Sequence, residues 1–336
     1  MRSFAFILIR GAAPGQHGKA LDFGAKRFRL CAAPGSDDRG MNFDFETYHA
    51  DVARLRRHRI FFIGGAMKSG TTWLQLLLDQ HPEISCGGEG HFPSYLIPLI
   101  VKTVDEYNEQ IAWKNESIFS ETPGYPQLLD EHRTYLWASA VAFQLGEQLK
   151  RKAAPVVGEK TPDNVRFFRL LHAVFPTARC IHIVRDGRDC AVSGWFHNLR
   201  VTPDWMRETF PTFDSYAQSF AQQWVLDVGE GTRFGAEHPD RYLMIRYEDL
   251  HREPATTLAR VCRILGVSDL PDIMERCCSG ASFERLSGGR APGQEDPASF
   301  FRKGETGDWR QHFSPEARDL FNEKAGAWLR QFGYGE

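Results

Sequence analysis

The sequence lacks a long hydrophobic run and an excess of charge of either sign. Its 336 residues include 41 Lys and Arg against 43 Asp and Glu, for a formal net charge of −2. Such a balance gives no reason to expect a nucleic-acid partner, so any anion site must be built locally from a few basic groups and backbone amides. No apolar stretch reaches the roughly 20 residues that a membrane-spanning helix needs.

The seven cysteines also form no pattern typical of a disulfide framework or a metal site. Their number is odd, and no pair has the spacing of a zinc ribbon or of a redox motif. Free cysteines of this kind are typical of a reducing compartment. The sequence therefore predicts a cytoplasmic protein without a bound metal.

The first 40 residues differ from the rest in composition. They begin with MRSFAFILIR, whose six consecutive apolar residues are few for a signal-peptide core. Residues 11–40 are rich in Gly, Ala, Pro and Arg and show no periodicity. We expect residues 1–40 to be non-globular, an extension or an upstream start assigned in error, and residues 41–336 to form one domain.

Short apolar runs alternate with helical patterns through most of the remaining chain. This alternation predicts a single α/β domain, in which a central parallel sheet is covered by helices on both faces. Asn164 is a predicted helix cap. Residues 102–130 are predicted to be irregular and to form an insertion or a lid beside the substrate site. The predicted strands are 59–63, a short one from 84, 155–158, 179–184 and 242–245.

A glycine-bearing turn follows the first predicted strand. Gly65 and Gly70 have the spacing of the nucleotide-triphosphate loop G-x-x-x-x-G-K-[ST], and Thr72 matches its final hydroxyl. Thr71 takes the place of the expected lysine, and a lysine is found inside the loop instead, as Lys68. Backbone amides of such a turn bind phosphate. The displaced lysine favours a nucleotide whose single 5′-phosphate bears a transferable group.

A second candidate anion site follows the strand at 179–184. Arg185 stands at the carboxyl end of that strand, where ligands of open α/β sheets bind, and Ser193 follows eight residues later. An arginine fork and a hydroxyl suit a terminal phosphate. Two alternatives stay open: Asp186 could be the metal-binding acid of an NTPase, or Arg185 could belong to a structural ion pair.

These motifs resemble those of the sulfotransferases that use 3′-phosphoadenosine 5′-phosphosulfate (PAPS). The run KSGTTW at residues 68–73 matches the family's 5′-phosphosulfate loop without a mismatch, and residues 301–309, FRKGETGDW, resemble its C-terminal loop. The arginine and serine of the second site have the spacing of the family's 3′-phosphate pair. One departure is Ala281, where the family usually has a threonine that contacts the cofactor.

The resemblance implies a P-loop-like three-layer fold and transfer of a sulfuryl group from PAPS to a hydroxyl acceptor, without a metal. Tyr247 resembles the family's tyrosine on the adenine side. The residues implied to bind the cofactor are Lys68, Ser69, Gly70, Thr71, Thr72, Trp73, Arg185, Ser193, Tyr247, Ser282, Phe283, Arg302, Lys303 and Gly304.

Sulfuryl transfer needs a cation at the oxygen that bridges sulfur and phosphorus, and a base at the acceptor. Lys68 is the candidate cation. Glu159, in a GEKTP segment that resembles the carbohydrate branch of the family, is the first candidate base; its alternative is a structural ion pair. His91 is the second candidate base, and Glu89 is a candidate acceptor contact.

The acceptor class stays open at this point. The C-terminal loop resembles the small-molecule branch, whereas residues 158–162 resemble the carbohydrate branch. A small alcohol, a phenol or a carbohydrate would each fit, and the chain could form a homodimer. The competing functions are a P-loop kinase or NTPase and a nucleotide-binding module without catalytic activity.

Overall fold

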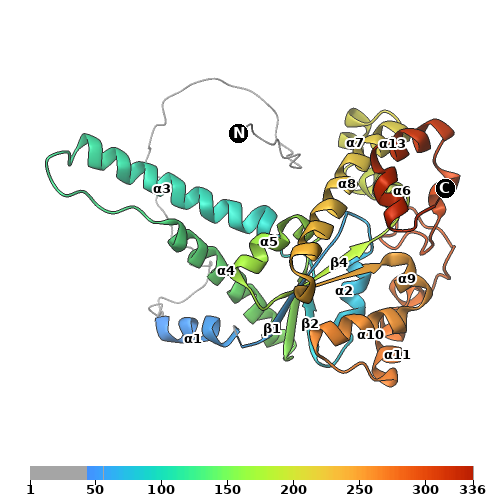
Figure 1. Ribbon diagram of the computed structural model, residues 1–336, viewed down its shortest axis with the longest axis horizontal. Coiled ribbons are helices and arrows are strands. Elements are labelled where there is room, and N and C mark those ends of the chain that lie inside the picture. The colour runs from blue at the N-terminus through green and yellow to red at the C-terminus, as the bar shows by residue number, and fades with distance from the viewer. Residues whose placement is uncertain (1–43, 56, 336) are drawn as a thin grey trace, which may run out of the picture. The chain divides into compact units, whose positions relative to one another are not determined.

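Five parallel strands form the central sheet of the computed structural model, which describes residues 44–55 and 57–335 (Figure 1). Their order across the sheet is β2-β3-β1-β4-β5. This confirms the predicted α/β class. The strands are β1 (Arg59–Gly64), β2 (Ile84–Gly87), β3 (Val156–Lys160), β4 (Arg179–Val184) and β5 (Tyr242–Arg246).

Helices connect the strands and cover the sheet (Figure 1). The α-helices are α1 (Phe45–Leu55), α2 (Thr71–Asp79), α3 (Ile97–Ser117), α4 (Asp130–Arg151), α5 (Asn164–Val174), α6 (Gly187–Val201), α7 (Pro203–Thr209), α8 (Phe213–Glu237), α9 (Tyr247–Arg252), α10 (Pro254–Leu265), α11 (Pro271–Gly280), α12 (Phe283–Leu286) and α13 (Pro315–Gln331). Three short turns of other helix types are η1 (Phe92–Leu96), η2 (Pro239–Arg241) and η3 (Asp308–Gln311).

The two faces of the sheet lie in two separate apolar cores. Phe61 and Ile63 of β1 pack with residues of α2, α10 and α11. Ile60 and Phe62 face the other way and pack with residues of α4 and α5. Successive side chains of a strand point to opposite faces, so a strand that is buried on both must be apolar throughout. This explains the continuous apolar run of β1.

The prediction of an irregular segment at 102–130 is wrong for its first half, because α3 extends through it. Pro98 lies in the first turn of that helix, where a proline costs no hydrogen bond. Val104 and Asn108 lie one helical turn apart and are both buried. Asn108 also holds the loop that follows: its Nδ2 donates to the Leu128 carbonyl, and Leu128 N donates to its Oδ1, each over 2.8 Å.

The predicted cap at Asn164 is also wrong. Asn164 is the first residue of α5, and its side chain does not bond the free amides of the helix. Its Nδ2 donates instead to the Ile63 carbonyl at 3.1 Å and to the Glu159 carboxylate at 2.7 Å. The side chain therefore links β1 to β3 at the edge of the sheet.

Parallel pairing brings three connecting segments to one edge of the sheet. Ile63 of β1 is paired with Lys160 of β3, and Gly64 is paired with His182 of β4. The turn after β1, the end of β3 and the turn after β4 therefore meet at the carboxyl edge. The candidate anion-binding segments lie on these connections.

None of the described helices is long and apolar enough to cross a membrane. The prediction for residues 1–40 falls outside the described part of the chain and stays a prediction.

The packing of β1 against β3 gives a test of the fold. A Cβ at Gly158 would lie within 2.1–2.4 Å of the Phe61 ring. We expect Gly158→Ala to lower the free energy of unfolding by about 1–3 kcal/mol, the usual cost of overpacking. Gly146→Ala in α4, where no atom lies within 4 Å, is the matched control and should stabilise the chain slightly. Denaturant unfolding measures both, and equal effects would contradict this packing.

Candidate active site

The turn between β1 and α2 is pressed closely against its neighbours. Gly65 N donates to the Pro162 carbonyl at 3.0 Å, and a Cβ at Gly65 would lie 2.3 Å from the Ile183 carbonyl oxygen. Gly70 has a φ of 97°, and a Cβ there would meet the Tyr247 ring at 2.4 Å. Only glycine fits at both positions. The backbone amides at the start of α2 are thereby held at the carboxyl edge of the sheet.

Lys68 has an unusual backbone and an unusual side-chain environment. Its φ of 68° lies in the left-handed region, which a residue with a side chain seldom adopts. Its Nζ lies 4.5 Å from the centre of the Phe300 ring. Burial, followed by the nearby charges of Arg185 and Arg200, lowers the pKa of Lys68 to about 8. The Lys68 ammonium group therefore loses its proton more readily than that of an exposed lysine.

Arg185 lies directly beside this turn. Its Nη1 donates to the Lys68 carbonyl at 3.4 Å, its Nη2 donates to the Glu305 carbonyl at 3.0 Å, and its guanidinium lies 4.3 Å from the centre of the Tyr247 ring. Its buried Nε has no hydrogen-bond partner among the described residues. Ser193 is partly buried in the second turn of α6, which begins directly after this turn. The two candidate anion sites are therefore adjacent.

The C-terminal loop is fastened to the same place through Asp189. Its two carboxylate oxygens accept hydrogen bonds from Gly307 N at 2.6 Å and from Trp309 N at 2.9 Å. Asp189 is buried, and hydrogen bonds to a buried carboxylate are among the stronger ones in proteins. Residues 301–309 are thus brought against the Arg185 turn.

Arg302 and Lys303 of this loop are both bound to Asp308. Lys303 Nζ lies 2.7 Å from Asp308 Oδ1, and the Arg302 guanidinium pairs with both Asp308 and Glu295. The Arg302 guanidinium also lies 4.6 Å from the centre of the Phe196 ring. Their charges are partly compensated within the loop, and an anion would bind through their remaining N–H groups.

Aromatic side chains lie behind the β1–α2 turn. Trp73 Nε1 donates to the Ala281 carbonyl at 2.9 Å, and its ring lies 5.7 Å from that of Tyr247. His251 lies about 6 Å from both rings, and its Nε2 is 2.9 Å from the Gly304 carbonyl oxygen. These contacts join α2, α9 and the C-terminal loop.

Ser282 and Phe283 have structural contacts in this region. Ser282 Oγ caps α12 by accepting a hydrogen bond from Arg285 N at 3.3 Å. The Phe283 ring packs against Gly304, where a Cβ would lie 2.5 Å from it. Gly304 has a φ of 69°. The structure therefore places Phe283 beside the C-terminal loop, whereas the Ser282 side chain is bound within its own helix.

Thr72 is linked to a partly exposed carboxylate through Lys160. Lys160 Nζ donates to Thr72 Oγ1 at 3.0 Å and to Glu89 Oε1 at 2.6 Å. Glu89 Oε2 lies 3.2 Å from His91 Nε2. The side chain of Lys160 is 3% exposed and that of Glu89 is 40% exposed. Glu89 also lies near enough to Lys68 to oppose the lowering of its pKa.

Glu159 has a different environment. Its carboxylate is buried and accepts hydrogen bonds from Gly90 N at 2.7 Å, from the Thr161 hydroxyl at 2.5 Å and from Asn164 Nδ2 at 2.7 Å. Burial raises the pKa of Glu159, and the Thr161, Asn164 and Gly90 hydrogen bonds oppose the shift. These bonds hold the turn that carries Glu89.

Several residues near Lys68 escaped the sequence reasoning. His197 of α6 lies 5.9 Å from the Phe300 ring, and Arg200 Nη2 lies 3.2 Å from His197 Nδ1. Burial, followed by the charges of Lys68 and Arg200, lowers the pKa of His197 to about 4. Neither Phe300 nor His197 stands in a recognisable motif, so only the fold reveals that they are neighbours of Lys68. Asp189, in contrast, lies within the motif that contains Arg185.

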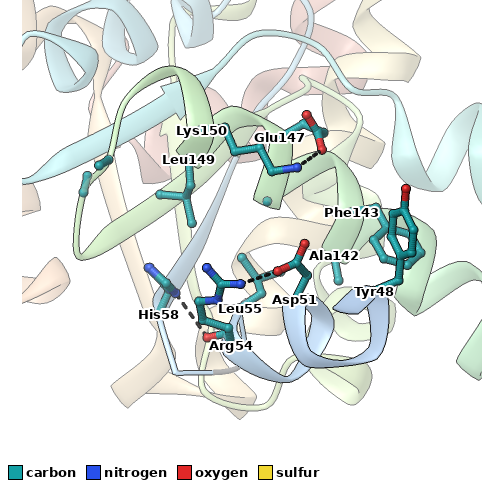
Figure 2. A pocket seen from close by; sticks show the side chains of 13 residues that line it. Tyr48, Asp51, Arg54, Leu55, His58, Ala142, Phe143, Glu147, Leu149 and Lys150 are labelled. Carbon is teal, nitrogen blue, oxygen red and sulfur yellow. Dashed lines mark hydrogen bonds and ion pairs between the residues drawn. The ribbon is translucent and has the colours of Figure 1, made fainter. Parts of the chain in front are cut away.

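A separate hollow of about 250 Å³ lies between α1 and α4 (Figure 2). The pairs Asp51–Arg54 and Glu147–Lys150 line it. Ala153 and Ala154, which also line it, lie shortly before the start of β3 at Val156, so the hollow lies toward the amino end of that strand. None of the predicted site residues lines it.

Comparison with known proteins finds one family. The model of the sulfotransferase family matches residues 61–272. A flavonol sulfotransferase-like protein of Flaveria bidentis is 25% identical over 281 residues, which cover 78% of this chain and 79% of that protein. Mouse protein-tyrosine sulfotransferase 1 is 31% identical over 143 residues, 42% of this chain and 34% of that protein.

Similar solved structures also include sulfotransferases. The crystal structure of a mouse sulfotransferase complexed with PAP has 19% sequence identity and a TM-score of 0.49. The match covers 89% of this chain and 98% of that one.

Proposed function

The chain belongs to the sulfotransferase family, and we propose that it transfers the sulfuryl group of PAPS to a hydroxyl group of an acceptor. The observation that supports this most strongly is the contact between the two anion-binding segments, where Arg185 Nη1 lies 3.4 Å from the Lys68 carbonyl oxygen. PAPS carries anionic groups at both the 3′ and the 5′ position of its ribose. A near-neutral chain can bind it only where basic groups from separate segments meet.

The 5′-phosphosulfate would bind at the start of α2, and the 3′-phosphate would bind at the turn after β4. The free amides of a helix N-terminus favour an anion, and an arginine fork suits a phosphate. Trp73 and Tyr247 offer aromatic faces to adenine. The residues proposed for the 5′ end are Lys68, Ser69, Gly70, Thr71 and Thr72; those for the 3′ end are Arg185, Ser193, Arg302, Lys303 and Gly304.

Lys68 would stabilise the charge that develops when the bond between sulfur and the bridging oxygen breaks. An ammonium group placed at that oxygen binds the transition state more tightly than the ground state. Its carbonyl is fixed by Arg185. The proposed role needs the protonated form, and the pKa of about 8 leaves most of the free enzyme protonated at neutral pH.

We assign the role of base to Glu89 rather than to Glu159. The carboxylate of Glu89 is partly exposed and lies near Lys68, and Lys160 links it to Thr72 of the cofactor turn. Glu159 is buried under three hydrogen bonds and suits the task of holding the turn. His91 contacts the other oxygen of Glu89 and is the alternative base.

The surroundings of Lys68 favour an aromatic acceptor such as a phenol over a carbohydrate. Phe300 and His197 lie on one side of its ammonium group, and the Tyr95 ring lies 4.8 Å from that of His91. Aromatic rings pack well against such faces. One relative named above is described as flavonol sulfotransferase-like and the other as a protein-tyrosine sulfotransferase, and flavonols and tyrosine both present phenolic hydroxyls.

A cytoplasmic location is part of the proposal. Cys86, Cys180, Cys190, Cys262, Cys277 and Cys278 are all free thiols in the described part of the chain. Free cysteines fit a reducing compartment.

Replacement of Lys68 tests its role directly. Lys68→Ala should lower kcat by about 10²–10³, as removal of one transition-state donor usually does, while PAP still binds through the Arg185 site. In the unmodified enzyme, kcat/KM for PAPS should fall above about pH 8 as the free ammonium loses its proton. Lys68→Arg should move that fall to higher pH, because a guanidinium stays protonated. A flat profile through this pH region would contradict the assignment.

Paired substitutions separate the two carboxylates. Glu89→Gln should lower kcat by about 10²–10⁴, the usual contribution of a general base, while its amide oxygen can still accept the hydrogen bond from Lys160. Glu159→Gln should instead destabilise the fold by about 1–3 kcal/mol, because it presents an amide group to buried donors. Steady-state kinetics and denaturant unfolding measure these effects. If Glu159→Gln folds normally and alone abolishes turnover, the assignment is reversed.

An acceptor screen with radiolabelled PAPS tests the reaction itself. We expect transfer to phenols to exceed transfer to alkyl alcohols and carbohydrates, and to persist in EDTA because no metal takes part. A kinase or NTPase would hydrolyse ATP and lose its activity in EDTA, since phosphoryl transfer needs Mg²⁺. ATP turnover without sulfuryl transfer would overturn the proposal.

A further inference from the structure

The chain end that follows α13 turns back onto the candidate active site. Gly333 has a φ of 73°, which glycine adopts without strain. Gly333 N donates to the Arg330 carbonyl at 3.0 Å, and Tyr334 N donates to the Leu329 carbonyl at 2.8 Å, the arrangement that often ends a helix. This reversal buries the Tyr334 side chain, which is only 6% exposed.

The Tyr334 hydroxyl is linked to both sequence neighbours of Arg185, directly to Val184 and through Glu248 to Asp186. It contacts the Val184 carbonyl oxygen at 3.3 Å and donates to Glu248 Oε2 at 2.7 Å. The other oxygen of Glu248 accepts a hydrogen bond from Asp186 N at 3.0 Å. The residues immediately before and after Arg185 are thus both held through one tyrosine and one glutamate.

A second set of contacts fastens the same turn to the same chain end. Arg188 Nη2 donates to the Gly335 carbonyl at 2.8 Å and to Asp186 Oδ2 at 2.8 Å. The Arg188 guanidinium also lies 3.7 Å from the centre of the Trp309 ring. The side chain of Arg188 is almost fully buried. The chain end therefore braces the turn, and the turn contacts the C-terminal loop.

We propose that Tyr334 is a positioning residue for the cofactor: through Glu248 it fixes the turn that aims Arg185 at the 3′-phosphate. The Arg185 guanidinium contacts both the Lys68 carbonyl and the Tyr247 ring. A small movement of its backbone would therefore move the guanidinium relative to both anion sites. Hydrogen bonds to the partly buried Glu248 carboxylate resist such movement.

The ring of Tyr334 has a packing role that can be separated from that of its hydroxyl. The Arg246 guanidinium lies 4.7 Å from the ring centre, and the Phe332 ring lies 6.5 Å away. Tyr334→Phe keeps the packing of the ring and removes the hydroxyl, with its hydrogen bonds to Glu248, Val184 and Arg246. Tyr242→Phe is the matched control, because the Tyr242 hydroxyl also makes a single strong contact, 2.7 Å from His182 Nδ1, on strands rather than on the Arg185 turn.

The proposal rests on the proposed function, so the test has one arm that needs the cofactor and one that does not. In calorimetry, Tyr334→Phe should weaken PAP binding about fivefold to tenfold, the effect expected from one buried hydrogen bond. KM for PAPS should rise by a similar factor while kcat changes little. Tyr242→Phe should leave both unchanged, although it also loses a hydrogen bond.

The second arm is hydrogen exchange of the full chain without ligand. The backbone amides of residues 185–188 should exchange faster in Tyr334→Phe than in the unmodified chain or in Tyr242→Phe. Unchanged exchange there, or PAP affinity lowered equally by both variants, would overturn the proposal. If the unmodified chain binds no PAP, the proposed function fails, while faster exchange would still show that Tyr334 holds the turn.

Discussion

The contact between Arg185 and the backbone of Lys68 is the interaction on which the site depends. It joins the turn after β4 to the turn after β1, and parallel pairing of these two strands makes it possible. A chain with a net charge of −2 has no general attraction for an anion. Positive charge and free backbone amides must be concentrated at one edge, and the neighbouring strands β1 and β4 do this.

Concentrating cations in one place has a cost that the surrounding structure offsets. Burial and the charges of Arg185 and Arg200 lower the pKa of Lys68, whereas the nearby Glu89 opposes this effect. Carboxylates also hold the loops of the site in place, as Asp189 does for residues 307–309. The acidic side chains of the site therefore organise the basic ones.

The candidate site residues that the sequence offered are those encoded locally. The turn at 68–73, Arg185 and the loop at 301–309 stand in motifs whose residues are close in the chain. The contacts of Glu89 with Lys160 and of Phe300 with Lys68 join residues far apart in sequence, which no spacing reveals.

The same contrast applies to the fold. The buried strands were predicted because their residues are apolar throughout. The irregular structure predicted for 102–130 was based on Pro123, Gly124 and Pro126, but these residues all lie beyond Ser117, where α3 ends. Asn164 has a residue type suited to a cap, but its Nδ2 donates to the Ile63 carbonyl and to the buried Glu159 carboxylate, and Asp163 takes the cap position.

In the proposed enzyme, one nucleotide is bound across the two anion sites. Titration calorimetry with adenosine 3′,5′-bisphosphate tests it most directly, using the full chain and an Arg185→Gln variant. We expect saturable binding of one nucleotide per chain that weakens with added salt and is largely lost in the variant. Absence of binding to the unmodified chain, or equal affinity of the two proteins, would contradict the account.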